Sequence, residues 1–336
     1  MGCVDPAAWR VRWESYPFAA ECRDIPIGWV IEADGGAIGG SIGNVPMLYD
    51  LGGRKVKAAI ATSWAVDAGH RTLAIQLITA FYRQKGVDLL LNGSANIVTA
   101  QVLTALRIPR VPIPDYARPC FWAVRPRAFA RAALMRRSIS GAAVLAYPAG
   151  LALGLRDILR RSGRGAISCR VDTLHGFDER FDLLWRDVTA GPPRLRAVRN
   201  RAVLEWRFGA DLRKGEAVVL TAENAGKFCG YAVLARRQGS DLGMELYDVA
   251  DLQAVGDSPG IVRDLLLGAI RFARQAGADA VKFTTGTPAK RAPAEALLPY
   301  SYRLPLWQLY YRTTQAELGA ALSSADAWDF SLFDTF

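Results

Sequence analysis

Histidine is nearly absent from this sequence, and its cysteines are not paired. Only two histidines, His70 and His175, occur among the 336 residues. The five cysteines, none in a Cys-x-x-Cys spacing, are Cys3, Cys22, Cys120, Cys169 and Cys229. Zinc sites and disulfide frameworks need clustered or regularly spaced histidine and cysteine. The sequence therefore predicts no metal site and no disulfide scaffold, and it favours a reduced, cytoplasmic location.

The sequence also lacks a clear membrane-spanning stretch. Residues 138–155 carry no charge and are flanked by Arg136, Arg137 and Arg156. This length is near the lower limit of the roughly 17–25 residues that span a bilayer, and alanine, glycine and Pro148 dilute its hydrophobicity. Membrane contact by 138–155 is therefore not expected. A helix that lies at an interface or faces a partner is the alternative left open.

Acidic residues are outnumbered by basic ones. The 42 Lys and Arg against 32 Asp and Glu give a net charge of +10. Such a protein attracts anions, which include nucleotides, an acidic acyl-carrier protein, RNA and anionic lipid. A chain of this length accommodates two domains of ordinary size.

The first part of the chain mixes strands and helices. Asp34-Gly35-Gly36 predicts a hairpin turn between two strands, the first from residue 28 and the second running to about residue 46. The elements expected after this hairpin are a strand at 54–66, a helix at 73–82, a strand at 88–93, a helix at 96–108 and a strand at 120–126. We expect the strand at 120–126 to close this first unit.

A similar order of elements recurs after residue 199. The elements expected there are a helix at 199–208, a hairpin at 216–237, a strand at 243–252, a helix at 261–278, a strand at 280–286 and a late strand at 304–314. The predicted fold class is α/β (α+β), with two units that each have a mixed, mainly antiparallel sheet flanked by helices. The expected division is an N-terminal domain at 1–129, a helical linker at 130–175 and a C-terminal domain at 176–336.

Several segments of the N-terminal unit resemble the GNAT acyltransferase superfamily. They are the strand GWVIEADGGAIGG, the strand ending ATSWAVD, the turn AGHRTLAIQL, and DLLLNG followed by NIVTAQVLTALRI. In the C-terminal unit the segment that resembles this superfamily is YDVADLQAVGDSPGIVRDLLLGAIRFARQAGADAVKF. The two units together are similar to bacterial tandem GNAT-like proteins. The resemblance implies two GNAT-type units and an acyl-CoA donor.

In that superfamily the pyrophosphate of acyl-CoA is held by a loop of pattern Arg/Gln-x-x-Gly-x-Gly/Ala at a helix N-terminus. Free backbone N–H groups and the helix dipole converge on an anion there. Here the loop begins at Arg71, and both glycine positions are replaced, by Ala74 and Gln76. The cofactor-binding residues that the resemblance implies are Trp64, Ala65, Val66, Gly69, His70, Arg71, Thr72, Leu73, Ala74 and Asn96.

Acyl transfer to an amine needs a proton acceptor, a group that polarises the thioester carbonyl and an acid for the leaving thiolate. The resemblance assigns the polarising N–H to residues 64–66. The superfamily's usual tyrosine acid is replaced by Leu103, and Tyr116 is the nearest substitute, expected in an exposed loop. Asn96 either contacts the cofactor or caps a helix. The candidate carboxylate bases are Glu32, Asp67, Glu245 and Asp248, of which Glu32 and Asp248 are preferred.

The leading hypothesis is an acyltransferase that moves an acyl group from acetyl-CoA or another acyl-CoA, or from phosphopantetheine on an acyl-carrier protein. The acceptor would be an amine on a small metabolite or sugar, bound near the junction of the two units. One alternative is a Fem-type transferase that uses aminoacyl-tRNA, because those enzymes also pair two GNAT-like units. The other is a non-catalytic binding or scaffold protein.

Overall fold

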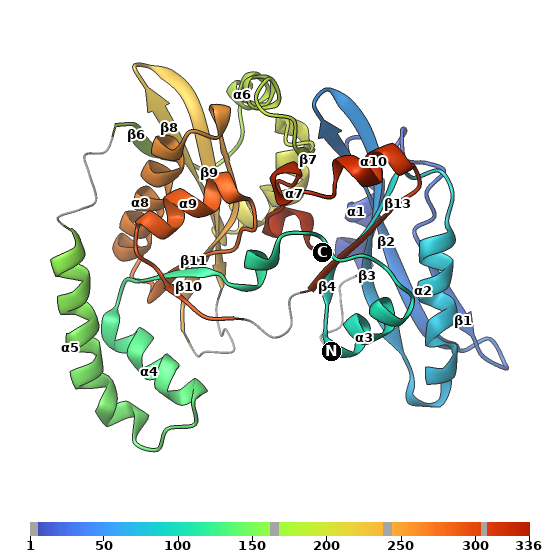
Figure 1. The fold of residues 1–336 in the computed structure, drawn as a ribbon, viewed down its shortest axis with the longest axis horizontal. Helices are drawn as coiled ribbons and strands as arrows, with labels where there is room; N and C mark the ends of the chain where they lie inside the picture. Colours follow the sequence, from blue (N-terminus) through green and yellow to red (C-terminus); the bar gives the residue numbers. More distant parts are fainter. Residues whose placement is uncertain (1–5, 162–167, 238–243, 304–307) are drawn as a thin grey trace.

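The computed structural model describes residues 6–161, 168–237, 244–303 and 308–336, which form two mixed sheets with helices around them (Figure 1). The strands of the first sheet, in spatial order, are β1 (Gly28–Glu32), β2 (Ile38–Leu51), β3 (Arg54–Val66), β4 (Leu89–Ala95) and β13 (Gln308–Thr313), and β7 (Leu195–Ala197) also pairs with β2. The strands of the second sheet are β12 (Tyr300–Ser301), β5 (Cys120–Ala123), β11 (Ala280–Phe283), β10 (Leu246–Ala254), β9 (Lys227–Arg237), β8 (Ala217–Asn224) and β6 (Arg170–Leu174).

Ten α-helices and five short 3-10 turns occur in these described residues. The helices are α1 (Pro6–Glu14), α2 (Ala74–Arg83), α3 (Ile97–Ala105), α4 (Pro126–Arg136), α5 (Ala142–Arg161), α6 (Arg180–Thr189), α7 (Arg201–Arg213), α8 (Pro259–Gln275), α9 (Pro288–Ala296) and α10 (Ala316–Ala321). The turns are η1 (Ala68–Leu73), η2 (Pro114–Ala117), η3 (Val255–Asp257), η4 (Ala325–Ala327) and η5 (Leu332–Asp334). No helix in the described ranges combines the length and the apolar character needed to cross a membrane.

The predicted strands and helices form in the predicted order, and the fold class of two mixed, mainly antiparallel sheets is confirmed. The strands and α-helices that were not predicted are α1, β6, α6, β7, α9, β12 and α10. Both predicted hairpins form. At the first tip Gly35 and Gly36 have φ of 82°, and at the second Ala225 and Gly226 have φ of 48° and 78°. Positive φ at both central positions matches the twist of paired strands, which explains the glycines there. Residues 304–307 of the predicted late strand lie outside the described residues.

The strand predicted to close the first unit lies in the second sheet, so that prediction is wrong. β5 pairs antiparallel with β11, with Phe121 opposite Lys282. In exchange, β13 crosses back and pairs with the outer edge of β4, with Tyr310 opposite Asn92 (Figure 1). Each short strand fills a sheet edge that would otherwise be unpaired. The two sheets therefore cross the expected boundary at residue 129, and the chain passes between them four times, because β7 of the first sheet also lies between β6 and β8 of the second.

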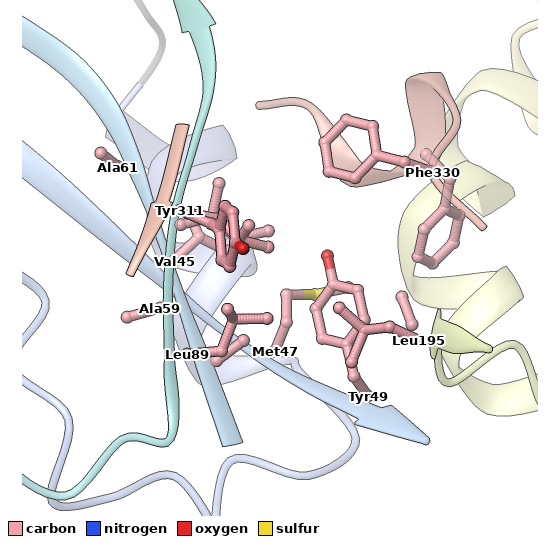
Figure 2. Close-up of a cluster of buried hydrophobic side chains, with 14 of the residues drawn as sticks. Val45, Met47, Tyr49, Ala59, Ala61, Leu89, Leu195, Tyr311 and Phe330 are labelled. Atoms are coloured by element: carbon pink, nitrogen blue, oxygen red, sulfur yellow. The ribbon is translucent and has the colours of Figure 1, made fainter. Parts of the chain in front are cut away.

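The sheets also share a hydrophobic core. Figure 2 shows Met47 and Tyr49 of β2 on the side of the first sheet where Leu195 and Phe330 lie. The same buried cluster continues into the second sheet, where it includes Tyr231. Because apolar burial is the main favourable term in folding, this continuous core holds the two sheets in a fixed relation.

Candidate functional site

The strands β3 and β4 separate before they end. Their parallel pairing runs from Ala58 opposite Leu89 to Ala61 opposite Asn92 and then stops, although β3 continues to Val66 and β4 to Ala95. Ser63 has a φ of 50°, and the β2–β3 register shifts at the same point, which defines a β-bulge. Ala65 and Val66 therefore pair with β2, Trp64 lies in the bulge, and none of the three has a described partner in β4. This is the splayed strand pair that the resemblance predicts.

The helix start after β3 is an open turn. η1 winds from Ala68 to Leu73 and runs directly into α2. Gly69, Arg71 and Thr72 are exposed, and a Cβ added to Gly69 would meet no atom within 4 Å. Gln76 is exposed as well, so its side chain does not fill the turn. The first N–H groups of such a turn have no intrahelical acceptor, which makes them available to an anion.

His70 and Leu73 belong to the packed side of this turn. The His70 ring lies against β2, where a Cβ on Gly39 would come within 2.8 Å of His70 Nδ1. His70 N–H donates to the Asp67 carbonyl at 2.9 Å, and Leu73 packs against the main hydrophobic core. These contacts fix the turn on the sheet while leaving Arg71 exposed.

The polar and acidic candidates lie in different surroundings. Asn96 caps α3, because its side chain accepts a 2.9 Å hydrogen bond from Thr99 N–H. That confirms the helix-cap role. Glu32 is exposed on β1, whereas Asp248 is buried on β10 and pairs with Arg237 at 3.1 Å and Lys282 at 2.8 Å. The structure thus keeps Glu32 apart from Asp248, on different sheets.

Tyr116 is buried, and the expectation of an exposed loop tyrosine is wrong. Only 1% of its surface is accessible, and its ring contacts Phe330 edge-to-face with centroids 5.4 Å apart. Burial raises the pKa of Tyr116 well above its usual value, and the nearby charges of Asp334 and Asp248 add to the rise. At neutral pH it therefore holds its proton firmly. It lines a cavity of about 570 Å³ together with Arg110, Arg303 and Gln308.

A second cavity, of about 500 Å³, lies where the splayed strands meet the second sheet. Its lining residues include Ser94 of β4, Arg207 and Asp211 of α7, and Arg237 of β9. Phe336 also lines it, and Thr62 on β3 donates a 3.1 Å hydrogen bond to the Phe336 carbonyl. We call this space the junction cavity. It lies at the junction where an acceptor cleft is expected.

Arg207 gives the junction cavity a half-buried cation. Its Nε donates to the Phe333 carbonyl at 3.3 Å and its Nη2 to the Thr335 carbonyl at 2.9 Å. Among the described residues no carboxylate forms an ion pair with it. Burial lowers the pKa of Arg207 to about 10, with a further contribution from Arg12. Asp211, which is half-buried, offsets part of this shift and is the carboxylate of α7 that lines the cavity.

Neither Arg207 nor Asp211 was among the residues expected in the site from the sequence. Both lie on the helix predicted from RNRAVLEWRF, but a helical pattern does not show which side chains meet another sheet. Burial also raises the pKa of Cys120 to about 11, so this thiol is not an activated nucleophile. In the described part of the chain no group of three or more His, Cys, Asp or Glu residues could hold a metal ion.

The second unit has a matching strand pair, but a carboxylate, Asp257 of η3, lies just before the helix that follows it. β10 and β11 pair in parallel up to Val249 opposite Phe283, and a bulge follows on β10. At the start of α8, Asp257 is already bound by Arg194 at 2.5 Å and Arg196 at 3.0 Å. A carboxylate there competes with any phosphate for the helix N-terminus. The first unit is therefore the better candidate for a donor site.

Solved structures with the same fold are known, although no family profile and no curated protein sequence matches this chain. A GCN5-related N-acetyltransferase from Anabaena variabilis superposes with a TM-score of 0.51 at 13% identity, covering 92% of this chain and 70% of the other. A conserved protein from Enterococcus faecalis, described as a probable N-acyltransferase, gives 0.50 at 8% identity, covering 92% and 71%. The N-myristoyltransferase of Saccharomyces cerevisiae with bound myristoyl-CoA gives 0.50 at 14% identity, covering 83% and 67%.

These structures define the class of the fold, an α/β architecture shared by N-acyltransferases. More particularly, it is the GNAT-type fold, as the resemblance in sequence predicted. At such low identity the likeness concerns the fold alone, because one fold carries many functions.

Proposed function

We propose that this protein is an acyltransferase that uses an acyl-CoA, or the acyl phosphopantetheine of a carrier protein, as donor and an amine as acceptor. The observation that carries the proposal is the end of β3–β4 pairing at Ala61 and Asn92, beside the open turn η1 and the junction cavity. An opening of this kind admits a slender thioester arm between two strands. It also gives the acyl group a path toward the second unit.

The residues of the first unit fit such a donor. The open N-terminal turn around Gly69 and the exposed guanidinium of Arg71 would bind the phosphates. A backbone N–H among residues 64–66, on the edge of β3 that has no described β4 partner, would hydrogen-bond the thioester carbonyl oxygen. The thioester itself supplies an acyl carbon that is already activated toward a nucleophile.

The junction cavity would bind the acceptor. Asp211 and Glu216 both line the cavity, and we assign Asp211, the less exposed of the two, to accept the proton of an attacking amine. Asp248 does not line the cavity and is held in ion pairs with Arg237 and Lys282. Arg207 would bind an anionic or strongly polar part of the acceptor. Tyr116 lines the other cavity, and its raised pKa keeps it protonated, so we do not assign it as the base.

The test is titration calorimetry of the protein with CoA and with acetyl-CoA, comparing the wild type with Arg71→Ala. We expect the variant to bind about tenfold or more weakly, because a charge-assisted hydrogen bond to phosphate is lost. Arg83→Ala is the matched control, since Arg83 is an exposed arginine at the other end of α2. Equal binding of CoA by all three proteins would show that the donor phosphates do not bind at η1.

A non-catalytic binding protein is the second candidate. It is favoured by one observation, that Leu103 is fully buried where the superfamily carries its tyrosine acid. Mass spectrometry of products, with acetyl-CoA and a panel of amines, separates the two, because a binding protein would retain the donor without forming an acylated amine. Salt-sensitive binding of aminoacyl-tRNA in place of CoA would instead support the Fem-type alternative.

A further inference from the structure

The helix α5 presents an apolar stripe to solvent. Ala142, Ala146 and Gly150 are buried, and Gly150 packs closely on the backbone of Arg127 in α4. On the opposite face, Val144 is 73% exposed, Leu151 76% and Leu155 56%. Positions 144, 151 and 155 recur at helical spacing, so they form one continuous stripe. We call the α4–α5 pair, residues 126–157, the helical hairpin.

Arginines accompany this stripe. The guanidinium of Arg127 lies 3.3 Å from the ring centroid of Tyr147, which is 57% exposed on α5. The same Arg127 also lines a groove of about 540 Å³ on α4, together with Arg125, Arg131, Met135 and Asp279. Residues 125–157 contain six arginines against the single acidic residue Asp157. The hairpin therefore joins an exposed apolar face to a strongly cationic groove.

The position of the hairpin narrows the choice of partner. α4 follows β5 directly, and α5 forms the outer edge of the molecule, on the side of the second sheet that faces away from α2 and β3 (Figure 1). An acyl-carrier protein docked there would lie at the edge of the molecule away from the splayed strands that its arm must reach. A bilayer surface needs no such proximity, and its anionic headgroups and acyl chains complement arginines and an apolar stripe respectively.

We propose that the helical hairpin binds the surface of a membrane that contains anionic phospholipid. The stripe of Val144, Leu151 and Leu155 enters the boundary between headgroups and acyl chains. Arg127 and Arg131 contact lipid phosphates. Membrane contact by 138–155 was not expected from the sequence, which left an interfacial or partner-facing helix open as the alternative; an interfacial helix needs only one exposed apolar face.

The experiment is sedimentation with vesicles of phosphatidylcholine alone and of phosphatidylcholine and phosphatidylglycerol in equal parts. We expect binding to the anionic vesicles only, weakened by salt. Leu151→Ser/Leu155→Ser removes the stripe, and Arg127→Gln/Arg131→Gln removes two charges; each is expected to weaken binding about tenfold or more. All four positions are exposed, so the variants should fold like the wild type.

Matched controls come from elsewhere in the chain. Leu183→Ser changes a leucine that is 54% exposed on α6, and Arg213→Gln changes an exposed arginine on α7. Both should bind vesicles like the wild type. Absence of binding to anionic vesicles, or binding that survives both hairpin variants, would overturn the proposal. So would a dimer in light scattering that Leu151→Ser/Leu155→Ser dissociates, because the stripe would then face a second copy.

Discussion

The Nε atom of Arg199 lies 3.0 Å from both carboxylate oxygens of Asp251, and both side chains are completely buried. The same guanidinium donates to Asp334 at 3.2 Å, and Asp334 in turn accepts a 2.9 Å hydrogen bond from the hydroxyl of Tyr49. Tyr49 belongs to the first sheet and Asp251 to the second. Arg199 therefore connects the two sheets through the C-terminal segment that lines the junction cavity.

We predict that Arg199→Met lowers the free energy of unfolding by about 3–5 kcal/mol, because Asp251 and Asp334 are left buried without their cation. Urea unfolding followed by tryptophan fluorescence measures this change. The control is Arg213→Met, which removes an exposed pair with Glu205 and should cost no more than about 1 kcal/mol. A similar loss of unfolding free energy in both variants would show that the buried network stabilises the fold no more than an exposed ion pair does.

The individual strands and helices of this fold could be predicted from the sequence. The exchange of β5 and β13 between the two sheets could not. Residues 54–66 and 89–95 carry their own apolar runs and turn signals, so each strand was recognisable by itself. The destination of β5 and β13 depends on which sheet edge is open after the rest has folded. The choice of sheet edge is a property of the tertiary structure, and it cannot be recognised in the sequence of a strand of four or six residues.

The residues of the candidate site also fall into those that the sequence predicted and those that it did not. The open turn at Gly69 and Arg71 was found because a helix N-terminus has a sequence pattern. Arg207 and Asp211 were missed because their role comes from the approach of α7 to the splayed strands, more than a hundred residues away in the chain. Tyr116 was misjudged because its loop is covered by Phe330 near the C-terminal end of the chain.

The proposed base gives a kinetic prediction. Asp211→Asn should reduce kcat for amine acylation by about 100-fold or more while leaving the Kd for acetyl-CoA unchanged, because the donor site lies on another element. Steady-state kinetics and calorimetry on the same preparation separate the two effects. Asp187→Asn, which changes an aspartate of α6 paired with Lys227 on the surface, is the control. An unchanged kcat in Asp211→Asn would rule out this residue as the base.

Asp329 makes the stability of the protein sensitive to acid. Burial alone would raise the pKa of Asp329, but the charges of Lys290, Arg196 and Arg199 outweigh it and hold the pKa below its ordinary value. The unfolded chain then binds a proton near pH 4 while the folded chain stays ionised. The stabilisation is present above about pH 4 and is lost as the pH falls toward the lower folded pKa. Urea unfolding at intervals from pH 6 to pH 3 should show this loss, and Asp329→Asn should flatten the slope.

The contact between Gly39 and His70 provides a way to perturb the donor turn without touching its exposed face. A Cβ at position 39 would lie within 2.8–3.0 Å of three atoms of the His70 ring, so Gly39→Ala must displace that ring. Because His70 belongs to η1, the displacement should move the open N–H groups and weaken CoA binding about tenfold, an effect typical of a small misplacement at a binding site. The double variant Gly39→Ala/His70→Ala removes the clash and should recover most of the affinity, whereas His70→Ala alone should bind nearly like the wild type. Calorimetry on these three variants completes a double-mutant cycle. Additive losses in the double variant would mean that the two residues act independently, and that the packing of His70 on β2 does not position the turn.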